Sequence, residues 1–188
     1  MINPTNASGR NFVYTSLAEW NSDGDLDNWN VYNASDIIVS NGFLSAVCSG
    51  SGDSQIIKSD TDGLPALDLD TNSSKIVEFR LKRASAPSDL DVFYATANNP
   101  GLSSDRKIKI QAVDMPQSNI FYTFRLDMSY ESQWESTLKT FRLDPVSTTG
   151  VTFKVDYIRI GQVTVPEPAL IYYLSPIVLL FIKNYLSK

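Results

Sequence analysis

The sequence predicts an all-β protein, an antiparallel β-sandwich followed by one C-terminal transmembrane helix. Two patterns support the sandwich. Apolar and polar residues alternate with a period of two through much of the chain, and clusters of Asn, Pro, Gly, Ser and Thr separate the alternating runs. A third pattern, an apolar run close to the C-terminus, predicts the helix.

The same patterns divide the chain into four parts. Residues 1–10 are expected to be a disordered N-terminal segment, and residues 11–162 the β-sandwich domain. Residues 163–168 form a spacer that contains Pro-Glu-Pro, and residues 169–188 form the helix with its basic end.

The strands of the domain are expected where apolar side chains occupy every second position. These runs are Val77-Phe79-Leu81, Leu90-Val92-Tyr94, Ile108-Ile110-Ala112, Ile120-Tyr122-Phe124-Leu126-Met128, Phe141-Leu143 and Val151-Phe153-Val155. Turn-forming residues at 98–101 and 147–150 lie between runs. Because each sheet must bury its apolar face against another, we expect roughly eight to ten strands in two antiparallel layers.

The C-terminal tail has the composition of a short membrane span. Pro166 and Pro168 favour an extended chain before them, so a spacer is expected ahead of the apolar run 169–182. At about 1.5 Å per residue, that run spans a hydrocarbon core of roughly 30 Å only by recruiting residues up to Leu186. Its apolar side chains surround a helix completely, unlike those of a surface helix. A buried C-terminal helix of the domain is the alternative, which the short length favours.

The order of parts in this tail resembles the PEP-CTERM sorting signal of bacteria that make extracellular polysaccharide. The matching residues are Pro166, Glu167 and Pro168, the apolar run, and the basic Lys183 and Lys188. The tail departs from the family in having two lysines in place of an arginine cluster, and in having Pro176 within the run. The resemblance covers only the tail. It implies that an exosortase-type enzyme recognises the protein while the helix is transiently inserted in the inner membrane.

Charge and the start of the chain complete this expectation. Lysines at the end of the helix are expected on the cytoplasmic side, which places the acidic domain outside. The protein is therefore expected in the cell envelope or outside the cell. Because residues 1–10 contain no apolar signal-peptide region, the export signal is expected to be missing from this chain.

Composition excludes several classes of function. The net charge of −5 and the pI near 4.7 argue against nucleic acid as a partner, because its backbone would be repelled. The single cysteine, Cys48, provides no disulfide within the chain. The absence of histidine removes Ser-His-Asp and Cys-His catalysis and the usual zinc sites.

Three segments of the domain look like the first and last strands of galactose-binding-like jelly rolls, a group with many carbohydrate-binding modules. They are 24–29, 141–145 and 153–161. The resemblance implies a sandwich whose ends lie on adjacent strands and which binds extracellular polysaccharide. It also implies a structural calcium ion, with Glu19 and Asp156 in the positions of its ligands. The alternative is that Asp156 bonds to a neighbouring loop and Glu19 is solvated.

Exposed aromatic side chains are the expected glycan contacts, because the C–H faces of sugars pack on aromatic rings and exposed rings are costly unless used. Trp134, with Tyr130 nearby, lies in a polar, turn-like segment and is the best candidate for an exposed platform. Trp29 follows a turn and is a further candidate, with capping of the sandwich core as its alternative role.

An enzymatic role ranks last. Glu131 and Glu135 form the one close pair of glutamates, and paired carboxylates carry out glycoside hydrolysis. No other catalytic sequence pattern accompanies them, so a solvated loop is preferred and no catalytic residue is predicted. A binding module requires Trp134 and its neighbours to be accessible on one face. A structural matrix protein predicts that these rings are buried beneath a smooth polar surface.

Overall fold

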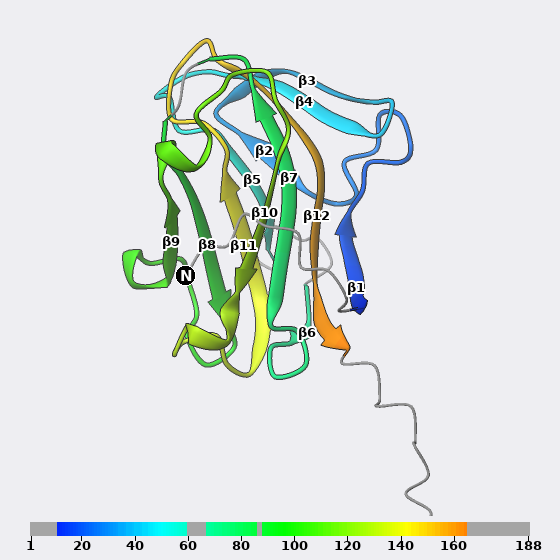
Figure 1. The fold of residues 1–188 in the computed structure, drawn as a ribbon, viewed down its shortest axis with the longest axis vertical. Coiled ribbons are helices and arrows are strands. Elements are labelled where there is room, and N and C mark those ends of the chain that lie inside the picture. Colours follow the sequence, from blue (N-terminus) through cyan, green and yellow to red (C-terminus); the bar gives the residue numbers. More distant parts are fainter. Residues whose placement is uncertain (1–10, 60–66, 86–87, 165–188) are drawn as a thin grey trace, which may run out of the picture.

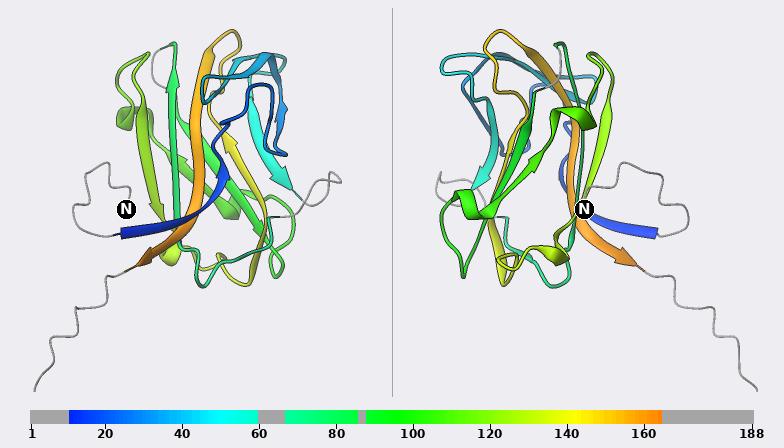
Figure 2. Two further views of the ribbon diagram at one scale, coloured as in Figure 1. Left: turned by 90° about the vertical axis from the view of Figure 1, so that its right-hand side faces the viewer. Right: turned by 60° about the vertical axis from the view of Figure 1, so that its left-hand side comes forward.

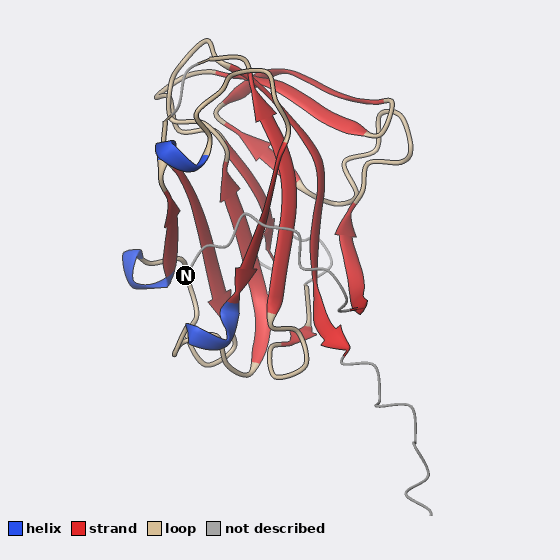
Figure 3. Cartoon of the chain, viewed as in Figure 1, coloured by secondary structure: helices blue, strands red, loops and turns tan. Residues whose placement is uncertain are grey.

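The computed structural model describes residues 11–59, 67–85 and 88–164, which form two antiparallel sheets packed face to face (Figure 1). The strands are β1 (Asn11–Ala18), β2 (Asn30–Tyr32), β3 (Ala34–Ser40), β4 (Phe43–Cys48), β5 (Gln55–Ser59), β6 (Leu69–Asp70), β7 (Ile76–Arg83), β8 (Leu90–Thr96), β9 (Lys107–Ile110), β10 (Tyr122–Asp127), β11 (Thr137–Asp144) and β12 (Thr152–Thr164). Helical structure in these residues is limited to the 3₁₀ turns η2 (Ser104–Arg106), η3 (Ala112–Asp114) and η4 (Met128–Tyr130) (Figure 3).

The two sheets have different strand orders. In sheet A the order is β10-β7-β12-β4-β3, and β1 pairs with the second half of β12. In sheet B the order is β2-β5-β11-β8-β9, and β6 pairs with the start of β11. The views in Figure 2 show the two layers and the pairing of β1 with β12. These pairings confirm the antiparallel sandwich and the adjacency of its first and last strands.

The period of two in the sequence separates the core from the two outer faces. In β7, Val77, Phe79 and Leu81 are fully buried, whereas Arg80 and Lys82, which point to the other face, are partly exposed. The same division holds in the other central strands. Complete burial of each large apolar side chain stabilises the fold by about 1.5–3 kcal/mol, which explains why the alternation is maintained along the chain.

Two expectations for individual segments are wrong. Segment 24–29 is a loop between β1 and β2 rather than the first strand, and its backbone turns where the Trp29 amide donates to the Leu26 carbonyl at 2.8 Å. The alternating run that begins at Ile120 overestimates β10, which starts at Tyr122 and leaves Ile120 46% exposed. A family resemblance misplaced the first segment, and in the second the alternating pattern begins before the strand pairing does.

The sorting residues Pro166, Glu167, Pro168, Lys183 and Lys188 all lie outside the described residues. So do residues 1–10. Within the described residues, no helix has the length and apolar character needed to cross a bilayer. The tail and the N-terminal segment therefore keep the status of sequence predictions.

Candidate functional site

The tryptophans proposed as a glycan platform are buried, which corrects that expectation. Trp134 is 6% exposed, packs edge-on against Tyr94 at 5.0 Å between ring centroids, and donates its indole N–H to the Ser74 carbonyl at 3.0 Å. Trp29 is 1% exposed and contacts Phe141. Both loops fold back onto the sandwich, because burying an indole ring is favourable once its N–H has a partner.

Tyr130, the third aromatic candidate, is 80% exposed, so its role in binding stays a prediction. Glu131 and Glu135 have separate partners: Glu131 accepts a hydrogen bond from the Tyr94 hydroxyl at 3.4 Å, and Glu135 accepts one from the Asn99 amide at 3.2 Å. The first contact ties a loop to β8, and the second joins two loops.

The two calcium candidates each face an arginine. Arg159 donates to Glu19 at 3.0 Å through Nε, and Arg80 forms an ion pair with Asp156. Calcium requires several oxygen ligands around one point. No group of three or more acidic, histidine or cysteine side chains that could hold a metal ion occurs in the part of the chain that the structure describes. The arginine-paired carboxylates therefore do not provide a ready ligand set, and calcium binding stays a prediction.

The outer face of sheet B brings together a different set of side chains. One row of cross-strand neighbours runs across all five main strands and comprises Asn30, Ile57, Arg142, Phe93 and Lys107, in the order β2, β5, β11, β8, β9. The adjacent row packs into the core and comprises Val31, Ile56, Leu143, Val92 and Ile108. Since successive side chains alternate between faces, the first row points outward.

Phe93 is the aromatic residue of this outer row and lies between Arg142 and Lys107. Its ring is partly exposed, with the Arg142 guanidinium carbon 4.7 Å and the Lys107 ammonium 5.7 Å from the ring centroid. The cations hold the ring in place through cation–π attraction. Sequence reasoning missed this residue, although a signal was present. Phe93 lies between the inward-facing Val92 and Tyr94, in the phase that otherwise carries polar side chains.

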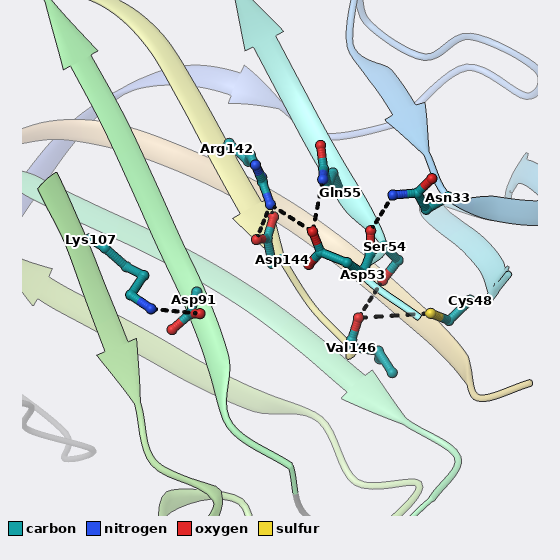
Figure 4. Close-up of polar contacts among 10 residues, drawn as sticks. All are labelled: Asn33, Cys48, Asp53, Ser54, Gln55, Asp91, Lys107, Arg142, Asp144 and Val146. Carbon is teal, nitrogen blue, oxygen red and sulfur yellow. Dashed lines mark hydrogen bonds and ion pairs between the residues drawn. The ribbon is translucent and has the colours of Figure 1, made fainter. Parts of the chain in front are cut away.

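A cluster of carboxylates surrounds Arg142 at one end of this face (Figure 4). Arg142 donates through Nε to Asp144 at 2.6 Å and through an amino group to Asp53 at 3.1 Å. Gln55 donates to the same Asp53 carboxylate at 2.9 Å. Burial raises the pKa of Asp144 to about 6, and the nearby Asp53 and Asp91 act in the same direction, whereas Arg142 opposes the shift.

A groove of about 540 Å³ begins beside this row. Its lining residues are Ile57, Ser59, Ala95, Thr96, Ala97, Pro100, Gly101, Leu102, Lys139 and Thr140. Ile57 belongs to both the row and the groove, so the two are continuous. Most of the lining side chains are small. Ser59, Thr140 and Lys139 add polar groups to this lining.

The loop that walls the groove is fixed by Arg106, the last residue of η2. Its guanidinium donates to the carbonyls of Pro100 at 3.2 Å and Gly101 at 2.6 Å, and to the Gln133 side chain at 2.9 Å. Asn99 in the same loop bonds to Glu135. The groove is thus a built feature whose wall is positioned before any ligand arrives, which lowers the cost of binding.

Several solved structures resemble this fold. No family model and no curated protein matches the chain. A family 29 carbohydrate-binding module matches with a TM-score of 0.53 and 9% identity, over 79% of this chain and 88% of that chain. A CBM4 module matches with a TM-score of 0.52 and 12% identity, over 78% of this chain and 99% of that chain. A family 29 variant complexed with cellulohexaose matches with a TM-score of 0.52 and 9% identity, over 79% of this chain and 89% of that chain. The domain therefore has the β-sandwich fold of carbohydrate-binding modules.

Proposed function

We propose that the domain binds an extracellular polysaccharide, without catalysis, along the outer face of sheet B. One observation carries the proposal: a preformed groove of about 540 Å³ is continuous with an outer row of side chains that includes the partly exposed ring of Phe93. Solved structures with the same fold include a carbohydrate-binding module in complex with cellulohexaose, which supports this class of ligand.

The chemistry of this face suits a sugar chain. Phe93 offers an apolar surface for the C–H face of one sugar ring. Arg142 and Gln55 on one side, with Lys139 on the other, present partly exposed polar groups toward the hydroxyl groups of a sugar. Ser59 and Thr140 are buried and hydrogen-bond to each other at 3.0 Å. Burial of the tryptophans agrees with the alternative of a structural matrix protein. The groove favours binding instead, because that alternative expects a surface without a ligand pocket.

Titration calorimetry of the full chain with cellulohexaose and a panel of soluble neutral polysaccharides tests this proposal. Phe93→Ala removes the apolar contact without touching the core, and we expect its Kd to rise roughly 5- to 30-fold, equivalent to about 1–2 kcal/mol. Tyr130→Ala is the matched control. Unchanged affinity in Phe93→Ala, or a loss confined to Tyr130→Ala, would contradict binding at the outer face of sheet B.

We further propose that the tail displays this domain at the cell envelope. The support is the sequence pattern alone: Pro166-Glu167-Pro168, the apolar run and the terminal lysines. An exosortase-type enzyme and the inner membrane would then be its partners. Fractionation of cells that express the chain behind a working signal peptide tests this part. A fully soluble product that retains its tail would contradict sorting.

A further inference from the structure

The outer face of sheet A, on the opposite side of the sandwich from the groove, carries basic side chains on its central strands. They are Arg80 and Lys82 on β7, Arg125 on β10, and Lys154 and Arg159 on β12. The arginines form ion pairs with Asp156, Glu78 and Glu19. Neither lysine forms an ion pair with any described residue. Among the described residues, these two positive charges thus have no ion-pair partner, in a chain whose net charge is −5.

The two lysines face each other directly across adjacent strands. Lys82 of β7 pairs in register with Lys154 of β12, and Ser45 of β4 is the next neighbour of Lys154 in the same row. All three side chains are partly exposed. Like charges at directly opposed positions destabilise a sheet. Because adjacent strands lie about 4.8 Å apart, a single carboxylate can accept from both ammonium groups and relieve this repulsion.

An aromatic pair adjoins the lysines. Phe43 of β4 and Phe121, which precedes β10, stack with their ring centroids 5.3 Å apart. The Lys82 ammonium lies 5.0 Å and the Arg80 guanidinium carbon 4.5 Å from the Phe121 centroid. Both rings are partly exposed. The face therefore combines an apolar contact for a sugar ring with two cations beside it, Lys82 and the ion-paired Arg80.

We infer that this face of sheet A is a second binding site, specific for acidic polysaccharide. The carboxylate of a uronic acid unit lies between Lys82 and Lys154, and neighbouring sugar units contact Phe43 and Phe121. A sugar strand fits better than an extended anionic surface, because a bilayer or a nucleic-acid duplex would also approach the acidic remainder of the molecule. The inference is independent of the groove on sheet B, which lies on the other face.

Polygalacturonate and its methyl ester are the test ligands, because they share one backbone and differ in charge. In affinity electrophoresis at low salt, the full chain is expected to bind the free acid about tenfold more tightly than the ester. The double variant Lys82→Gln/Lys154→Gln is expected to lose this preference. The control Lys75→Gln/Lys109→Gln removes the same charge from other exposed positions and is expected to keep it.

Each other outcome overturns the inference. Equal affinity of the wild type for acid and ester shows that the face does not recognise carboxylates. Equal losses in the two double variants show that net charge alone determines binding. Loss of the acid preference in Phe93→Ala places the acidic ligand in the groove of sheet B. Lysine-dependent sedimentation with phosphatidylglycerol vesicles, without polygalacturonate binding, assigns the face to lipid.

Discussion

The buried carboxylate of Asp144 makes the stability of the domain depend on pH in a calculable way. Its side chain is 8% exposed, and burial raises its pKa from 3.8 to about 6. Between these two values the folded protein keeps a proton that the unfolded chain has released. Stability therefore falls as the pH rises through this interval and is level above it. Asp144→Asn removes the titrating group and leaves the shape of the side chain almost unchanged.

The size of the effect follows from the interval. At 1.36 kcal/mol per pH unit, the step from 3.8 to about 6 corresponds to roughly 3 kcal/mol of unfolding free energy. All other carboxylates are present in both proteins, so the difference in unfolding free energy between wild type and variant isolates the contribution of Asp144. The absolute cost of breaking the contact with Arg142 is the same at every pH above the interval.

Urea denaturation of wild type and Asp144→Asn, in buffers from about pH 3 to about pH 7, measures this difference. We expect the unfolding free energy of the wild type, minus that of the variant, to fall by about 3 kcal/mol across the range. A difference that stays constant or rises with pH would refute the reasoning, since a rise means that Arg142 holds the carboxylate ionised. Asp68→Asn removes an exposed carboxylate, and an equal change there would assign the effect to charge count.

Three further predictions concern stability. The Glu78 side chain is 5% exposed and accepts hydrogen bonds from Arg125, Tyr14 and Tyr157. Glu78→Gln should therefore lower the unfolding free energy by about 2–3 kcal/mol and the thermal midpoint by roughly 5–10 °C. An unchanged midpoint would show that the network contributes nothing to stability. A Cβ on Gly161 would lie 2.3 Å from the Val13 carbonyl oxygen, so Gly161→Ala should speed hydrogen exchange of the β1 amides, whereas Gly101→Ala, with open space around it, should not. Equal exchange in the two variants contradicts the steric argument. If Glu19 and Asp156 bind calcium, a chelator should lower the melting midpoint, and identical midpoints count against both residues.

The sandwich could be predicted because burial of apolar side chains, which stabilises it, leaves an alternating pattern in the sequence. In β7, every second side chain from Val77 to Leu81 enters the core, and the apolar phase is therefore visible in the sequence. In β12 the same alternation shifts by one residue between Val155 and Tyr157, where the pairing with β7 is irregular. Strand ends and pairing partners are less accessible, because they depend on turns and on contacts far apart in the chain. Segment 24–29 shows this limit. Resemblance placed it in the first strand, but its Gly, Asp and Asn residues favour turns, and its backbone turns and carries Trp29 into the core.

The glycan candidates failed for a related reason. Polar flanking residues around Trp134 suggested exposure, yet a loop can fold so that one large ring is buried while its neighbours remain in water. Trp134 is 6% exposed, whereas Glu135 beside it is exposed. The composition of a loop does not report the direction of a single side chain. Inside a strand the period of two fixes that direction, so the stronger signal lay in the strands.

An aromatic residue in the polar phase of a strand is that signal, and it occurs next to both proposed sites. Phe93 lies between the buried Val92 and Tyr94, and Phe121 belongs to the phase of Thr123 and Arg125. A ring at an outward position makes no contacts with the core, so any favourable contacts of the ring are with neighbours on the same face or with a ligand. At Phe93 and at Phe121 the neighbours are cations. Cations keep such a ring ordered and partly accessible, which is the state that binding a sugar requires.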